Sequence, residues 1–133
     1  MTENQTVVTA AELALRSRPI TEEVVIAAGE SISTALDKSH HSHLAILLPA
    51  TWTTAQITFL GSDTFDGTFN QVLSATDALE VCIPSVAASK VIVLDTEFLE
   101  ALISVPFIKL RSGTLLAPTN QGVEVEIKIV LRR

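Results

Sequence analysis

The sequence is poor in cysteine, in basic residues and in long apolar runs, and each scarcity removes a class of protein. Cys82 is the single cysteine, so no disulfide can form within the chain and no paired-thiol site exists. Nine Lys and Arg against fifteen Asp and Glu give a formal net charge of −6. This balance argues against binding free nucleic acid, because basic residues must replace the counterions of the phosphates. Stability must therefore come from packing, and we expect no nucleic-acid partner.

Apolar runs in this sequence are short. The stretch 44–50 (LAILLPA) is among the longest, and it falls far below the roughly 20 residues that cross a bilayer. The first residues, MTENQ, lack both the basic region and the apolar region of a signal peptide. We therefore expect a soluble protein that has no signal peptide and no membrane partner.

Motifs of catalysis and cofactor binding are also missing. The sequence contains no G-x-S-x-G, no G-x-x-x-x-G-K-[ST] and no G-x-G-x-x-G pattern. Acidic pairs such as Glu124 and Glu126 have a simpler interpretation, since they form the outward face of an expected strand. We predict that the protein is not an enzyme, with no catalytic residue, no cofactor and no metal.

Apolar and β-branched residues are abundant. The 133 residues suffice for one domain with a core, and a hydrophobic share of 47% with a mean hydropathy of +0.42 is too apolar for disorder. Val, Ile and Thr together make up 39 residues, and β-branched side chains pack best on a pleated surface. The composition therefore favours one globular domain built from β-sheet.

Short β-type runs recur about every ten residues from residue 20 onward, separated by Gly, Pro, Asn, Asp and Ser. The expected strands are residues 21–27, 31–36, 43–48, 56–60, 68–73, 79–83, 90–94, 107–111 and 123–131. In the last run, alternate residues are apolar and should share one buried face: Val123, Val125, Ile127, Ile129 and Leu131. This pattern predicts an all-β fold, an antiparallel jelly-roll-like β-sandwich.

Two segments interrupt the strands. Asp66-Gly67 predicts a turn, because such a pair tolerates the positive φ that tight hairpins demand. Residues 95–105 place apolar side chains at helical spacing ahead of Pro106, which predicts one short helix between strands. The apolar residues of that helix are Phe98, Leu99, Leu102 and Ile103.

Residues 1–19 differ from the rest, because they lack the two-residue alternation and end in RSRP. We therefore divide the chain into an N-terminal arm, residues 1–19, and a β-sandwich domain, residues 20–133. The arm is either a frayed terminus or a segment that reaches a neighbouring subunit. Its apolar residues would make that contact: Val7, Val8, Leu13 and Leu15.

Two features are candidates for binding sites. His41 and His43 would share one face of an extended segment, as paired metal ligands do, and His40 lies beside them. No Cys or carboxylate lies at ligand spacing, so we favour the interpretation of these histidines as solvated residues at the start of a strand. The alternative is a metal site whose ligand set is completed across a symmetry axis. Trp52, within TWTT, is either a plug at one end of the sandwich or a platform that stacks on a sugar ring.

Residues 48–59 (LPATWTTAQITF), the Asp-Gly turn, residues 107–113 (FIKLRSG) and residues 127–132 (IKIVLR) follow one another in a distinctive order. This succession resembles small β-sandwich proteins encoded among the virion genes of tailed bacteriophages. The resemblance spans roughly residues 45–133, and its order and spacing are more specific than any single motif. The arm and residues 97–105 depart from the common pattern.

The resemblance implies a structural protein on the capsid surface of a virion. A capsid cement or decoration protein of this kind binds the major capsid protein of the assembled shell, often as a trimer. Low charge and high apolar content also favour a homo-oligomer, because obligate interfaces resemble a core cut in half. The alternative function is a carbohydrate-binding or host-adhesion module of a head fibre, neck or tail, since related jelly-roll sandwiches occur in carbohydrate-binding modules.

Overall fold

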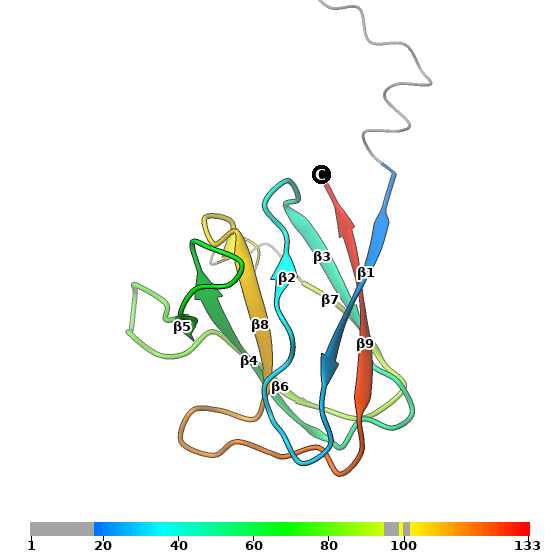
Figure 1. The fold of residues 1–133 in the computed structure, drawn as a ribbon. Coiled ribbons are helices and arrows are strands. Elements are labelled where there is room, and N and C mark those ends of the chain that lie inside the picture. The colour runs from blue at the N-terminus through cyan, green and yellow to red at the C-terminus, as the bar shows by residue number, and fades with distance from the viewer. Residues whose placement is uncertain (1–17, 95–98, 100–101) are drawn as a thin grey trace, which may run out of the picture.

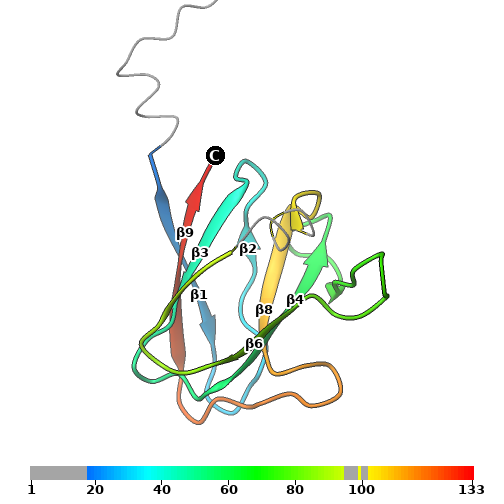
Figure 2. The same cartoon turned by 180° about the vertical axis from the view of Figure 1, so that it is seen from behind.

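A computed structural model describes residues 18–94, 99 and 102–133 of the chain. Within these residues, two antiparallel sheets pack face to face (Figures 1 and 2). The strands are β1 (Ile20–Ile26), β2 (Leu36–Asp37), β3 (His43–Leu47), β4 (Ala55–Ser62), β5 (Asn70–Gln71), β6 (Cys82–Val86), β7 (Val91–Val93), β8 (Phe107–Ser112) and β9 (Val125–Arg132).

The strand order is that of a jelly roll. One sheet has the order β1-β9-β3-β7, and the other has the order β2-β8-β4, with both β5 and β6 beside β4. Successive strands alternate between the two sheets except for β4, β5 and β6, which stay together. This alternation produces the paired Greek keys of a jelly roll. The predicted all-β sandwich is confirmed.

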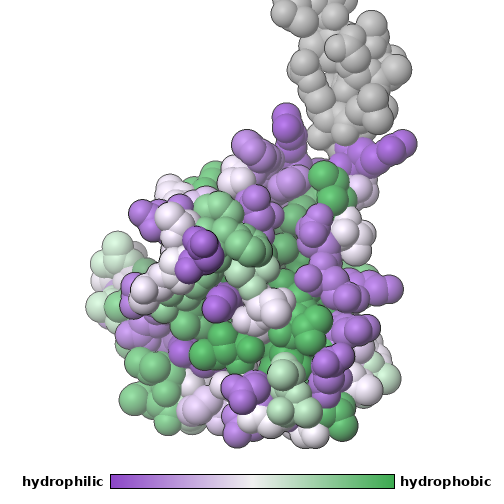
Figure 3. Space-filling view, viewed as in Figure 1, coloured by the Kyte–Doolittle hydropathy of each residue, from purple (hydrophilic) through white to green (hydrophobic). Residues whose placement is uncertain are grey.

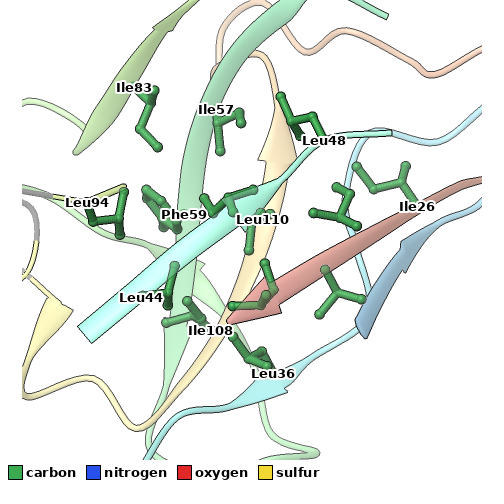
Figure 4. Packing of buried hydrophobic residues seen from close by; sticks show 14 of the residues in the cluster. Ile26, Leu36, Leu44, Leu48, Ile57, Phe59, Ile83, Leu94, Ile108 and Leu110 are labelled. Atoms are coloured by element: carbon green, nitrogen blue, oxygen red, sulfur yellow. The ribbon is translucent and has the colours of Figure 1, made fainter. Parts of the chain in front are cut away.

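The core lies between the two sheets and follows from the alternation of side chains. In β9, the four apolar residues Val125, Ile127, Ile129 and Leu131 are at most 1% exposed, whereas the residues between them reach solvent. Side chains of the second sheet, Ile57, Phe59 and Leu110 among them, fill the other half of the same space (Figure 4). Burying each such side chain stabilises the fold by about 1.5–3 kcal/mol.

Four predicted strands differ clearly from the observed ones, and one of them, the run 68–73, contains only the two residues of β5. Val123 was expected inside with β9, but it precedes the strand and is 51% exposed. The run 79–83 is shifted, since β6 begins only at Cys82. The run 31–36 leaves only Leu36 in a strand, because the hydroxyls of Ser33 and Thr34 bond to backbone groups where ladder bonds would form.

The chain does turn at Asp66-Gly67, but it does not form a tight hairpin there. The whole stretch 63–69 connects β4 to β5, and the glycines with positive φ among the described residues are Gly29 and Gly113, not Gly67. A connection of this length relaxes the demand for positive φ that a two-residue turn imposes.

The predicted helix at 95–105 falls largely outside the described residues, which exclude 95–98 and 100–101 and therefore Phe98. Leu99 and Leu102 have helical backbone conformation, and Leu102 is buried in the core while Ile103 is exposed. Within the part of the chain that the structure describes, no helix has the length and hydropathy needed to cross a membrane.

Candidate functional site

One end of the sandwich is formed by loops with few charges. Loops 27–35, 48–54, 87–90 and 113–124 gather at the end opposite the C-terminus (Figure 1), and we call it the low-charge end. Within these four loops, the charged residues are Glu30, Lys90 and Glu124. Burying a charge in an interface is costly, so an end with few charges is suited to contact with another protein.

Gln121 ties three of these loops together. Its side chain is fully buried, and its Oε1 accepts a hydrogen bond from Thr53 N at 2.7 Å, while Nε2 donates to Ser112 Oγ at 2.7 Å. Its backbone joins the first loop, because Gly29 N donates to Gln121 O and Gln121 N donates to Glu30 O. A buried amide with these partners holds the loops in one arrangement. Sequence reasoning missed Gln121, since a lone glutamine in a loop has no spacing signal.

The loop between β8 and β9 presents leucine at its tip. Leu116 is 94% exposed and Leu115 is 51% exposed, and Figure 3 shows apolar atoms at the lower left, where this loop lies in Figure 1. Gly113 and Pro118 form a bridge at its base, and Gly113 has a φ of +90° with Ala117 O only 2.5 Å from the position of an added Cβ. The turn therefore requires glycine and projects an ordered apolar tip, which we call the leucine tip.

A buried ion pair attaches the leucine tip to the outer face of the five-stranded sheet. Arg111 of β8 is 4% exposed and pairs with Glu80, whose Oε1 accepts from Leu115 N at 3.0 Å. Arg111 Nε also donates to Thr58 Oγ1 at 3.1 Å, and that hydroxyl donates to Gly113 O at 2.7 Å. This network fixes the base of the tip. Arg111 and Glu80 are 31 residues apart, so no local sequence pattern predicts their ion pair.

Trp52 lies inside the low-charge end. Its side chain is 4% exposed, belongs to the core cluster, and donates from Nε1 to Val86 O at 3.0 Å. The interpretation as a plug fits this burial. The alternative of an exposed sugar platform does not, because the ring is covered by protein and its N–H is already bonded.

The histidines lie at the opposite end. His41 and His43 line a small cavity of about 10 Å³, which has room for one water at most. His41 Nδ1 is buried without a hydrogen-bond partner among the described residues, and His43 Nδ1 lies 3.1 Å from Ser42 Oγ. His40 lines an open groove with Arg133, and His41 also borders this groove. Within residues 18–94, 99 and 102–133, no group of three or more potential ligands is placed to hold a metal.

Two charged groups beside the histidines have shifted pKa values. Hydrogen bonds from the Ser39 hydroxyl and backbone N–H, at 2.6 and 2.9 Å, lower the pKa of the Asp37 carboxyl, and nearby His40 and His41 add to this effect. Burial lowers the pKa of the Lys38 ammonium. The hydrogen bonds thus favour the charged form of Asp37, whereas burial disfavours the charged form of Lys38.

The outer face of the four-stranded sheet has an apolar strip beside β7. The register places Val93, Ala45 and Val130 in one cross-strand row, with Val91 beside Leu47 in a neighbouring row. Val91 and Val93 are 65% and 75% exposed, and the other three are half-buried. We call these five residues the apolar strip, and contiguous exposed apolar residues of this kind mark contact surfaces.

Comparisons with known proteins do not assign a family. A scan against protein-family models and a search of curated proteins both find no match. Among solved structures, the chain is similar to the SPBc2 prophage-derived protein YomS, with 15% identity, a TM-score of 0.47, and coverage of 86% of this chain and 95% of that one. At that identity and TM-score, the likeness carries no argument about function.

The arm residues Val7, Val8, Leu13 and Leu15 lie outside the described residues, so their contact with a neighbouring chain stays a prediction. At the low-charge end, sequence reasoning singled out Trp52 but not the leucine tip. A signal for the tip was available, because residues 113–118 place two leucines between a glycine and a proline, where polar turn residues are usual.

Proposed function

We propose that this chain is a non-enzymatic structural protein of a bacteriophage virion, a capsid cement or decoration protein that binds the major capsid protein of the assembled shell. The observation that carries the proposal is the low-charge end with Leu115 and Leu116 at its ordered tip. The sequence resemblance to small virion β-sandwich proteins supplies the particle and the capsid surface as the location.

The tip suits a role as an anchor. Burying a fully exposed leucine side chain stabilises a complex by about 1.5–3 kcal/mol, and Leu116 has almost all of its surface to lose. The ion pair of Arg111 and the buried amide of Gln121 hold the loops before binding. A contact that is ordered in advance loses little conformational entropy on association.

Charge distribution favours the same end. The chain has a net charge of −6, and the low-charge end contains few of its charged residues. Exposed charged residues are common elsewhere in the described part, at the opposite end above all: Arg18, Asp37, Asp63, Asp66 and Arg133. Docking through the low-charge end leaves these groups solvated.

Binding to shells tests the proposal. Shells assembled from the major capsid protein of the same phage are mixed with the full chain, and co-sedimentation measures the bound fraction. We expect the L115S/L116S variant to bind at least about tenfold more weakly, because two apolar side chains no longer enter the contact. I103S is the matched control, since Ile103 is also exposed, at 59%, but lies at the opposite end.

Two results would contradict the proposal. If the unsubstituted chain does not sediment with the shells, the cement function is wrong. If L115S/L116S binds as well as the unsubstituted chain, the low-charge end is not the docking surface, and weaker binding of I103S would point to the opposite end instead.

The arm extends the proposal to the part of the chain outside the described residues. We propose that residues 1–19 pack on a neighbouring chain or on the shell, and every described strand begins at or after Ile20. Deleting residues 1–19 is expected to weaken assembly. The sandwich should still fold, which a cooperative thermal unfolding transition would show. Undiminished particle binding after the deletion would reject this role.

A further inference from the structure

The edges of the two sheets are protected unequally against pairing with other chains. Edge strand β1 includes Glu22 and Glu23, edge strand β6 includes Pro84, and β2 and β5 are each only two residues long. Charges, proline and shortness are the devices that keep exposed edges from pairing. Edge strand β7 has the sequence Val91-Ile92-Val93, with no charge and no proline.

The backbone groups on the open side of β7 belong to its two valines. β7 pairs only with β3 among the described strands, and Leu94 N donates to Leu44 O at 3.2 Å at one end of this ladder. Bonded residues alternate along an antiparallel strand, so Ile92 also bonds to β3. The N–H and C=O groups of Val91 and Val93 therefore point to the open side, and their side chains are 65% and 75% exposed.

We propose that β7 pairs with β7 of a second copy of this chain, antiparallel, about a two-fold axis beside Ile92. The edge is self-complementary, because the axis places Val91 of each copy opposite Val93 of the other. Each of these two pairs can exchange two backbone hydrogen bonds, as directly opposed residues of an antiparallel ladder do. The two four-stranded sheets then form one continuous sheet, and their apolar strips become neighbours.

A second copy fits this edge for two reasons. Each chain has a net charge of −6, so copies must meet through an uncharged surface, and the apolar strip beside β7 is one. Two-fold pairing also covers the exposed edge of both copies in a single contact, as closed symmetric dimers do. The inference uses a surface other than the low-charge end, so it stands or falls independently of the proposed function.

Paired substitutions test the contact. Sedimentation velocity of the full chain is expected to show a dimer, and V91K/V93K is expected to weaken dimerisation by about 100-fold or more, because it gathers four ammonium groups at the axis. V123K is the matched control: Val123 is 51% exposed but lies in the loop before β9, and its substitution should leave the dimer unchanged. Circular dichroism of each variant shows that the sandwich is retained.

Two further variants test the register. In V91K/V93E, each new ammonium faces the new carboxylate of the other copy, so dimerisation should return and weaken as salt is added. In C82S/I92C, the new thiols lie opposite each other beside the axis, where non-bonded antiparallel pairs have Cα atoms about 4.5 Å apart, within disulfide range. Oxidation should give a covalent dimer, whereas C82S/V123C should stay monomeric on a denaturing gel.

Several results would overturn the proposal. A monomeric chain at the highest concentration reached excludes a second copy as the occupant, and slow amide exchange at Val91 and Val93 in that monomer would show that the chain covers its own edge. A dimer that V91K/V93K does not weaken uses another surface. If the chain is a trimer and V91K/V93K dissociates it, the β7 edge is in the contact but the copies are not related by the proposed two-fold axis.

Discussion

The two sheets differ in how their outer faces are covered. On the five-stranded sheet, the connection between β4 and β6 folds back over side chains of β8 that alternate with buried ones. Three contacts fasten it: Lys109 Nζ lies 4.6 Å from the ring centre of Phe69, the rings of Phe65 and Phe107 meet edge-on at 5.9 Å, and Arg111 pairs with Glu80. On the four-stranded sheet, the described residues include no such cover. The apolar strip therefore lies bare on the outer face, beside edge strand β7.

This difference shows two ways of dealing with an outer face. The covered face uses the chain's own residues, so its contacts should appear in the free energy of unfolding. The bare face keeps its apolar residues at the surface, so its contacts should appear in association instead. Substitutions on the two faces are expected to separate these two quantities.

The largest effect is expected on the covered face, for R111A. Removing the guanidinium leaves Glu80, whose side chain is only 15% exposed, without its partner, and it also ends the bond to Thr58 Oγ1. Breaking a buried pair on one side costs about 3–5 kcal/mol, and urea denaturation at neutral pH measures the loss. R111M/E80L is the control, because replacing both partners by apolar residues should cost much less. Equal losses in the two variants would show that packing, not the ion pair, fastens the connection.

A smaller contrast is expected in thiol reactivity. Burial, and secondarily the charge of Glu80, raise the pKa of the Cys82 thiol, which lies in β6 beside Thr58 on the covered face. A raised pKa leaves less thiolate at any given pH, so alkylation of Cys82 should be slow, with its pH–rate profile displaced to higher pH. C82S/E126C places a thiol on the bare face, where residue 126 is exposed, and it should react about tenfold faster at pH 8. Equal rates would show that the connection does not shield Cys82.

The sandwich itself was predictable, because burying one face of a strand imposes a period of two on the sequence. Leu131 and the other alternate apolar residues of β9 follow this period and are buried. The run at 31–36 failed because the hydroxyls of Ser33 and Thr34 accept hydrogen bonds from the backbone N–H groups of Leu110 and Val25, which belong to neighbouring strands. Such bonds depend on a neighbouring strand that is distant in sequence, and periodicity does not detect them.

The candidate surfaces were less predictable than the fold. Trp52 drew attention by its type, but its indole N–H bonds to Val86 O, 34 residues away, which no sequence pattern reveals. The apolar strip combines residues of β3, β7 and β9, so it exists only once the register of three strands is known. Gln121 is likewise important through its partners rather than through its own position in the sequence.

A still smaller effect on stability is expected for K109M, again on the covered face. The substitution keeps most of the side-chain packing but removes the charge over the Phe69 ring. A cation–π contact near the surface contributes about 0.5–1 kcal/mol, so the midpoint of urea unfolding should fall slightly while its slope stays the same. F69L should give a comparable loss, and the K109M/F69L double variant should lose less than the sum of the two. Additive losses would show that the two side chains do not interact.

The smallest effect on stability is expected on the bare face, for V93T. Val93 is 75% exposed, and threonine keeps both the β-branched shape and the strand preference. At a dilution where the chain is monomeric, the free energy of unfolding should change by no more than about 0.5 kcal/mol. Self-association, measured by sedimentation velocity at higher concentration, should nevertheless weaken, because the hydroxyl is harder to bury than the methyl group it replaces. A loss of monomer stability approaching that of R111A would mean that part of the chain outside the described residues covers this face, and the contrast between the two faces would then disappear.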